Sequence, residues 1–169
     1  MQNSDFLEFA RTKVKKILFV NCWHANESES AAMWDLYSNR NSGVAIKTTV
    51  ERLKASLRGG ETFLGAVRYV DFSNYIEREV LNVMVPAFLK RSSFEHEREV
   101  RLLHFKGEDL GSPLEVSAQK VCLNTLMQSV YLSPVMPAWT ADAVLDVAER
   151  FGVSRDVFVK SDLYNKNII

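Results

Sequence analysis

The pattern of apolar and polar positions along the chain predicts strands that alternate with helices. Apolar side chains occupy both alternating faces of residues 17–24, which is typical of a strand covered on both sides in the middle of a sheet. The Val, Tyr and Phe content of residues 63–72 predicts another strand. Further strands are expected at 44–48, 95–105, 114–116, 129–132 and 157–160.

Helical spacing of apolar residues predicts the intervening helices. The clearest covers residues 141–151, with Thr140 as its cap, Gly152 after its end, and Val144, Leu145 and either Val147 or Ala148 on its buried face. Other helices are expected at 49–57, at 74–91 with an interruption at Pro86, and as a single turn at 124–127. These elements together predict an α+β fold, a mixed sheet with flanking helices, in a single compact domain over residues 1–169.

The stretch CWHANESESAAMWDLYS, residues 22–38, contains both a helix start and candidate site residues. Asn26 followed by Glu29 is a variant of the capping box, so we expect Asn26 to cap a helix that begins there. Trp34 and Tyr37 lie one turn apart on this helix, where they form either core packing or the apolar wall of a ligand site.

Composition narrows the classes of partner. The 169 residues contain 21 Lys and Arg and 21 Asp and Glu, so the formal net charge is zero and nucleic-acid binding is not expected. The apolar runs are too short to span a bilayer, and no membrane partner is expected. The two cysteines have no metal-ligand spacing, which indicates no metal site and a reducing, cytoplasmic location.

Two groups of polar residues are candidates for chemistry. Trp23 and His24 end the strand at 17–24, just before a helix, where open sheets often bind ligands. In SFEHEREVRLLHF, strand alternation puts Glu97, Glu99 and Arg101 on one face. This face is either a solvated strand edge or a carboxylate pair with an arginine, suited to general-base catalysis or to binding a ribose hydroxyl. We expect His24 to share a cleft with this row, with Trp23, Trp34 or Tyr37 as the apolar wall.

Five motifs in this order resemble a family of bacterial and phage-borne proteins known as domain of unknown function 2971. They are CWHANESESAAMWDLY, SGVAIKTT, GAVRYVDF, KRSSFEHEREVRLL and LNTLMQSVYLSP. The resemblance begins near Val20 and continues to the C-terminus. Members usually have a longer N-terminal part, so the chain resembles the C-terminal portion of a member or a shortened one. The positions that match the family's polar pattern are Trp23, His24, Asn26, Glu29, Ser30, Trp34, Tyr37, Glu97, Glu99 and Arg101.

The resemblance has implications for function, although the family has no established activity. Full members are similar to ADP-ribosyltransferase-like folds, in which a strand-borne glutamate orients the nicotinamide ribose of NAD. This implies an enzyme of a defence or toxin system that acts on a nucleotide-containing small molecule, with Glu97, Glu99 and His24 as catalytic candidates and NAD as the candidate cofactor. The alternative is a non-catalytic interaction or regulatory module with Trp23, Trp34 and Tyr37 in its partner surface. A homodimer is also a candidate assembly.

Overall fold

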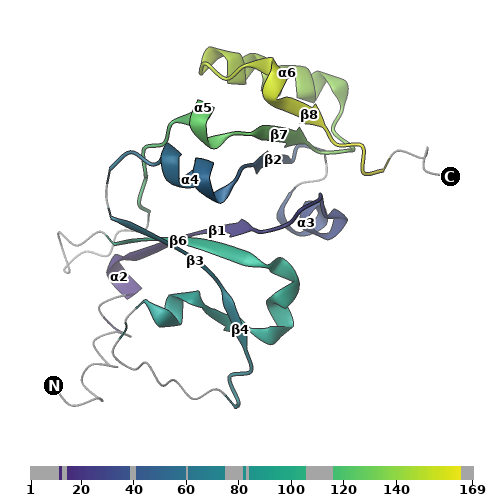
Figure 1. Ribbon diagram of the computed structural model, residues 1–169. Helices are drawn as coiled ribbons and strands as arrows, with labels where there is room; N and C mark the ends of the chain where they lie inside the picture. Colours follow the sequence, from purple (N-terminus) through teal and green to yellow (C-terminus); the bar gives the residue numbers. More distant parts are fainter. Residues whose placement is uncertain are drawn as a thin grey trace. The chain divides into compact units, whose positions relative to one another are not determined.

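The computed structural model describes residues 12, 15–38, 41–59, 61–74, 82, 84–105 and 116–164 (Figure 1). The chain forms two compact units, each built from two separate segments. The first unit comprises Met1–Asn26 and Gly60–Ala118, and the second comprises Glu27–Gly59 and Gln119–Ile169. Both contain helices and mixed or antiparallel sheets, which confirms the predicted α+β class. That residues 1–169 form a single domain stays a prediction.

The first unit contains a three-stranded antiparallel sheet in the order β1 (Leu18–His24), β6 (Glu99–Phe105), β3 (Thr62–Ala66). The short helix α2 (Lys15–Ile17) leads into β1. The predicted strand at 17–24 is therefore confirmed, but its predicted place in the middle of a sheet is wrong. Among the described strands β1 pairs only with β6, and Val20 is 46% exposed. An apolar run indicates the tendency to form a strand, whereas the number of neighbouring strands depends on distant segments.

A second, two-stranded sheet in this unit pairs β4 (Arg68–Val70) in parallel with β5 (Leu89–Arg91). The 3-10 helices η2 (Val85–Phe88) and η3 (Ser92–Glu97) flank β5. The helix predicted at 74–91 lies partly outside the described residues, and its described end is η2 and β5 instead. The strand predicted at 95–105 begins only at Glu99. Of the strand predicted at 114–116, only Val116 is described, and it lies outside the strands.

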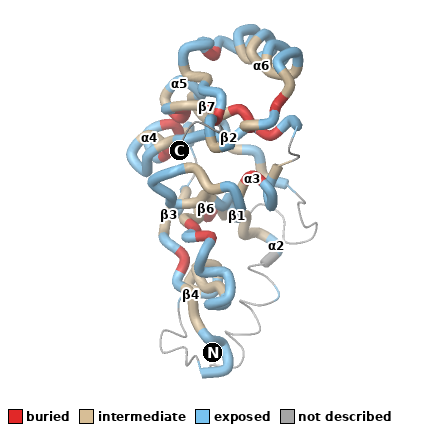
Figure 2. Tube along the Cα trace, turned by 90° about the vertical axis from the view of Figure 1, so that its right-hand side faces the viewer, coloured by how far each residue is buried: buried red, intermediate tan, exposed pale blue. Residues whose placement is uncertain are grey.

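The second unit contains a mixed sheet in the order β2 (Val44–Lys47), β7 (Ser129–Leu132), β8 (Phe158–Lys160). The β2–β7 pair is antiparallel and the β7–β8 pair is parallel. Val130 and Leu132 of the central strand are 2% and 4% exposed, and Figure 2 marks such buried residues in red. The helical elements of this unit are α3 (Ala31–Tyr37), α4 (Val50–Ser56), α5 (Leu123–Leu126), α6 (Ala138–Arg150) and η4 (Arg155–Val157).

The start of α3 differs from the prediction. The helix begins at Ala31 with Ser30 as its N-cap residue, so the predicted cap at Asn26 is wrong. Glu29 does not reach back to a helix start. Its Oε2 instead accepts hydrogen bonds from Trp34 Nε1, at 3.2 Å, and from the Ser161 hydroxyl. Tertiary partners for the Glu29 carboxylate thus take the place of a local capping box.

Helix α6 also begins earlier than predicted, directly after Pro137, so Thr140 lies inside it. Of the predicted buried face, Val144, Leu145 and Ala148 are half-buried, and Ala148 packs against Met127, Val130 and Val153, while Val147 is 53% exposed. The helix ends in a Schellman motif. Gly152 N–H donates to Glu149 O at 2.9 Å and Val153 N–H donates to Ala148 O at 3.0 Å, with Gly152 at φ 76°.

We predict that Gly152→Ala lowers the free energy of unfolding by about 1 kcal/mol, because a Cβ disfavours the left-handed conformation. The cost is conformational, since a Cβ at this position would meet no atom within 4 Å. The matched control is Gly152→Asn, which tolerates this conformation and should be less destabilised. Urea denaturation of the three proteins measures the difference, and equal midpoints for all of them would contradict the assignment.

Candidate functional site

The strand register of the first unit places four polar side chains on one face of the three-stranded sheet. His24 pairs with Glu99 and Cys22 pairs with Arg101 across the β1–β6 ladder. Residues directly opposite each other in an antiparallel ladder project from the same face. His24, Cys22, Glu99 and Arg101 therefore share this face, which we call the polar face.

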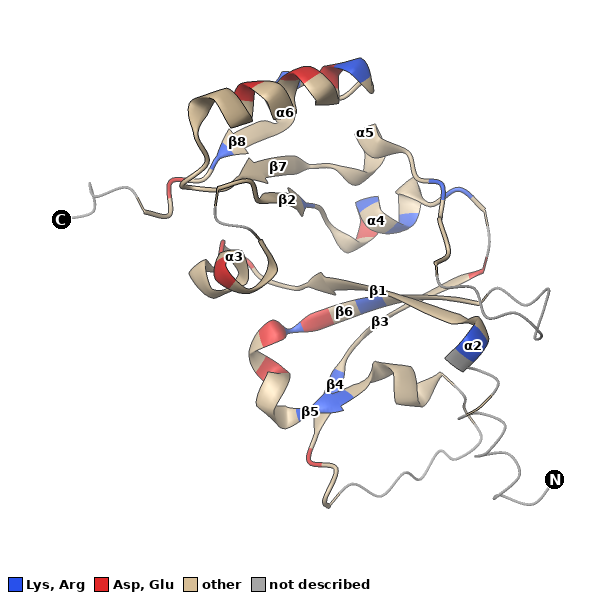
Figure 3. Ribbon diagram, turned by 180° about the vertical axis from the view of Figure 1, so that it is seen from behind, with Lys and Arg blue, Asp and Glu red and all other residues tan. Residues whose placement is uncertain are grey.

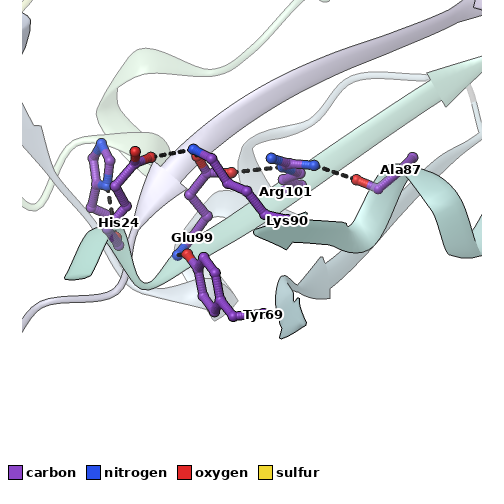
Figure 4. A network of polar contacts seen from close by, with 7 residues as sticks. His24, Tyr69, Ala87, Lys90, Glu99 and Arg101 are labelled. Atoms are coloured by element: carbon purple, nitrogen blue, oxygen red, sulfur yellow. Dashed lines mark hydrogen bonds and ion pairs between the residues drawn. The ribbon is translucent and has the colours of Figure 1, made fainter. Parts of the chain in front are cut away.

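A network of four charged side chains occupies the polar face (Figure 4). Lys90 Nζ lies 2.6 Å from Glu97 Oε2 and 2.7 Å from Glu99 Oε1, and Arg101 Nε lies 2.6 Å from Glu99 Oε2. Arg101 Nη1 also donates to the Ala87 carbonyl at 2.5 Å. The two glutamates are 4% and 5% exposed. Two carboxylates and two cations balance, so the network brings no net charge into a buried region.

Backbone groups fix the two glutamates as well. The amide of Glu99 donates to the Tyr69 hydroxyl at 2.8 Å. His24 Nδ1 lies 2.8 Å from the carbonyl oxygen of Glu97, and since a carbonyl only accepts, Nδ1 must carry the hydrogen. His24 therefore lies beside Glu97 within the first unit, and the cleft that they are predicted to share stays a prediction.

Arg98, between the two glutamates, adopts a left-handed conformation with φ 44° and ψ 52°, which costs a residue with a Cβ roughly 1–2 kcal/mol. Its amide donates to Glu95 O at 3.2 Å, and its carbonyl accepts from Ala25 N–H at 2.9 Å. The prediction that strand alternation aligns both glutamates is wrong, because Glu97 ends η3 and only Glu99 lies on β6. The turn at Arg98 takes the chain from the 3-10 helix into the strand, and both carboxylates reach one ammonium.

An aromatic ring lies on the sheet beside this network. Gly65 of β3 pairs with Arg101, and a Cβ on Gly65 would come within 2.8 Å of the Phe88 ring. A side chain larger than hydrogen at this position would displace the ring. The glycine thus allows η2, which carries Phe88 and Ala87, to approach the strand that carries Arg101.

The network keeps Glu99 ionised. Burial raises the pKa of the Glu99 carboxyl, but the hydrogen bonds from Lys90 and Arg101 outweigh burial and lower the pKa to about 2. Burial lowers the pKa of Lys90, but its hydrogen bonds to the two glutamates reverse this effect and the net shift is upward. Burial and the nearby Glu99 charge raise the pKa of Cys22. The interpretation of this run as a solvated strand edge is wrong, because the carboxylates are buried and β6 is the central strand.

The aromatic candidates are not part of the polar face. Trp23 pairs with Val100 on the opposite face of β1, and its Nε1 donates to Asn21 Oδ1 at 2.5 Å. Trp34 and Tyr37 belong to the second unit, where Trp34 is 7% exposed and Tyr37 is 61% exposed. That one of these rings forms the wall of the site stays a prediction.

Sequence reasoning did not identify Lys90 or Tyr69 as site residues. In the sequence, Lys90 and Arg91 form a basic pair of the kind that usually lies on the surface. Figure 3 shows basic residues on β4 and β5 and acidic residues along η3 and β6. The one available signal was indirect, because two buried carboxylates require a compensating cation. Among the described residues, no group of three or more His, Cys, Asp or Glu is arranged to hold a metal ion.

Comparison with known proteins supports the family resemblance and adds no activity. Residues 33–102 match the family described as "Protein of unknown function (DUF2971)", which confirms the predicted resemblance. No curated protein and no solved structure matches the chain significantly. Within the described residues, none of the helices has the length and apolar character needed to cross a membrane.

We predict that Glu99 makes stability depend on pH in acid. Its pKa is about 2 in the folded chain and about 4.5 ordinarily, so its contribution is complete above pH 4.5 and is lost as the pH falls towards 2. Glu99→Gln should remove this dependence, which amounts to a free energy on the order of 3 kcal/mol. Urea denaturation between about pH 2 and pH 6 measures it.

The control for this experiment is Glu95→Gln, since Glu95 is exposed on η3 and outside the network. This variant should keep the slope of the wild-type chain. Parallel stability curves for the wild type and Glu99→Gln would show that the network does not hold Glu99 ionised.

Proposed function

We propose that this chain binds a nucleotide-containing small molecule, with NAD as the first candidate, and acts on it as a transferase or hydrolase. The proposal rests on the geometry of the site, since the matched family is described as one of unknown function. The polar face of the first unit is the proposed binding surface. The observation that carries the proposal is the pair of glutamates, 4% and 5% exposed, that converge on the Lys90 ammonium.

Energetics support a functional role for this pair. Burying charged groups costs desolvation energy, and apolar side chains of similar volume often stabilise a fold equally well or better. A network of four charges is therefore poorly explained by stability alone. Ionisable groups with strongly shifted pKa values also concentrate at functional sites, and Glu99 is such a group.

The geometry favours different roles for the two glutamates. Both oxygens of Glu99 are occupied, by Lys90 and Arg101, and a carboxylate with a pKa of about 2 is a weak base at neutral pH. We therefore propose Glu99 as a positioning residue. Glu97 uses Oε2 for Lys90, while its Oε1 has no hydrogen bond within the described part of the chain. Glu97 Oε1 is the proposed acceptor for a ribose hydroxyl.

The proposed reaction breaks the bond between ribose and nicotinamide. Water, in a hydrolase, or an acceptor nucleophile, in a transferase, forms the new bond to the ribose carbon and loses one proton, while nicotinamide leaves with the bonding electrons. A carboxylate that accepts a hydrogen bond from the ribose stabilises the positive charge that develops on the sugar. Glu97 would supply this contact and His24 is the neighbouring group for proton transfer.

We predict that NAD raises the melting temperature of the wild-type chain and that Glu97→Gln abolishes most of the shift, because a neutral amide loses the charge that favours the ribose contact. Glu95→Gln is the matched control and should respond like the wild type. A wild-type chain whose melting temperature is unchanged by millimolar NAD, ADP-ribose and AMP would refute nucleotide binding.

Cysteine alkylation gives a second readout of the same experiment. Bound NAD should slow alkylation of Cys22, which shares the polar face with Arg101. Cys122 in the second unit serves as the internal reference. The hydrogen bond from the Thr125 hydroxyl, at 3.3 Å, lowers the pKa of Cys122 to about 7, so it reacts readily at neutral pH. Equal protection of both thiols would indicate a global effect and count against binding at the polar face.

A second candidate function is a non-catalytic interaction module, and helix α6 provides the observation that favours it. Trp139, Val147 and Phe151 are 74%, 53% and 75% exposed and are spaced in multiples of four residues. Ala143 completes this stripe along the helix. The buried Trp34 is less suited to a partner surface. We propose a second copy of the chain as the occupant, because antiparallel pairing of the stripe would place Trp139 of each copy beside Phe151 of the other, a contact that is the same on both copies.

We predict that the wild-type chain dimerises with increasing concentration and that the double variant Trp139→Ser, Phe151→Ser stays monomeric, because it removes the two largest exposed apolar side chains of the stripe. Asp142→Ser, an exposed polar position on the same helix, is the control and should retain most of the self-association. Light scattering coupled to size-exclusion chromatography measures the mass, and a monomeric wild type at high concentration would exclude this candidate.

A further inference from the structure

We infer that Arg98 binds the phosphate of the nucleotide ligand. This inference rests on the proposed function and names the ligand group that the polar face recognises besides the ribose. Arg98 lies between Glu97, which we assign to the ribose, and the positioning residue Glu99. In a nucleotide the phosphate is bonded to the 5′ oxygen of the ribose. A residue next to Glu97 in the chain is therefore suited to bind the phosphate while Glu97 binds the ribose.

The charge balance of the site supports this role. Glu97 and Glu99 are neutralised by Lys90 and Arg101 through ion pairs of 2.6 to 2.7 Å. Arg98 is exposed, and its guanidinium has no ion pair or hydrogen bond with the residues that the structure describes. It is therefore a positive charge beyond those the network uses. A guanidinium binds phosphate through two parallel hydrogen bonds. Lys90 and Arg101 are already paired with the two glutamates, so Arg98 is better placed to bind a phosphate than they are.

The backbone at Arg98 supports the role independently. Its left-handed conformation, φ 44°, is required for its carbonyl to accept from Ala25 N–H while the adjacent Glu97 carbonyl meets His24 Nδ1. Glycine or asparagine meets such a requirement with less strain. Arg98 is the one described residue other than glycine with a positive φ. The backbone hydrogen bonds explain the left-handed conformation, but they do not explain why the residue is an arginine. A ligand that binds the guanidinium explains the choice of residue.

The turn also fixes where the side chain begins. His24 Nδ1 bonds to the carbonyl before Arg98, and Ala25 N–H bonds to the carbonyl of Arg98 itself, at 2.8 and 2.9 Å. The Cα of Arg98 is thus held beside the end of β1, next to His24. Preorganisation of this kind reduces the entropy lost when a long side chain binds a ligand.

The test compares ligands with and without phosphate on three proteins. Isothermal titration calorimetry is carried out with NAD, AMP and adenosine on the wild type, Arg98→Gly and Arg98→Lys. We expect Arg98→Gly to bind NAD and AMP at least about tenfold more weakly than the wild type, while its affinity for adenosine is unchanged. Arg98→Lys should lose less affinity for NAD and AMP than Arg98→Gly, because it keeps the positive charge. The matched control is Arg91→Gln, which removes an exposed arginine of β5 that lies over the Phe72 ring, and it should bind like the wild type.

Stability measurements separate a ligand role from a folding role. Arg98→Gly should unfold at the same or higher urea concentration than the wild type, because glycine relieves the left-handed strain. A variant that binds NAD as tightly as the wild type would overturn the role of Arg98 and leave the proposed function intact. A wild-type chain that binds none of the three ligands would overturn both. Equal loss of NAD and adenosine binding in Arg98→Gly would also overturn the phosphate assignment.

Discussion

The ammonium of Lys90 between two carboxylates holds the first unit's short elements to its sheet. Strands β4 and β5 have three residues each and pair with one another, so few backbone bonds attach them elsewhere. Lys90 of β5 and Tyr69 of β4 both contact Glu99 on β6, and Arg101 binds the Ala87 carbonyl of η2. Polar contacts therefore attach these short elements to the sheet. In the second unit, by contrast, apolar residues such as Met127, Val130 and Val153 pack into a core cluster. The same groups that would bind a ligand attach these elements to the sheet.

Local signals predicted much of the secondary structure. The strands at 44–48 and 129–132 were predicted to within one residue, because alternation and turn residues bound them closely. Helix α4 was predicted from the helical spacing of its apolar residues, and in the structure the Thr49 side chain caps it by accepting from Arg52 N–H at 3.2 Å. The α+β class followed from the sum of such segments. Each of these features depends on residues close together in the sequence, which is the range over which a periodic pattern is informative.

The predictions that failed involve partners distant in the sequence. Asn26 resembles a helix cap, yet Glu29 binds Ser161, and α3 begins later than the local pattern indicates. Residues 95–98 alternate like a strand, yet they form a 3-10 helix and a left-handed turn whose bonds reach Ala25 and His24. His24, Glu97, Glu99 and Arg101 were singled out because charged residues in an apolar run are conspicuous, and the structure brings them together in one unit, while their role as a site stays a prediction. Lys90 was not identified as part of it, because sequence spacing does not indicate which cation neutralises a buried carboxylate.

Each unit is built from an early and a late segment of the chain, and this affects how the chain folds. The first unit pairs Leu18 with Phe105, and the second pairs Val44 with Leu132, so each sheet joins an early strand to a much later one. Non-local pairing of this kind gives a high contact order, which slows folding because loop closure comes before most of the contacts that compensate it. During synthesis, β1 cannot pair until β6 has been made, and β2 cannot pair until β7 has been made. Both early strands are therefore unpaired at the same time. Until β6 is synthesised, β1 lacks the strand it pairs with in the folded chain, and the nascent chain is then most prone to aggregation.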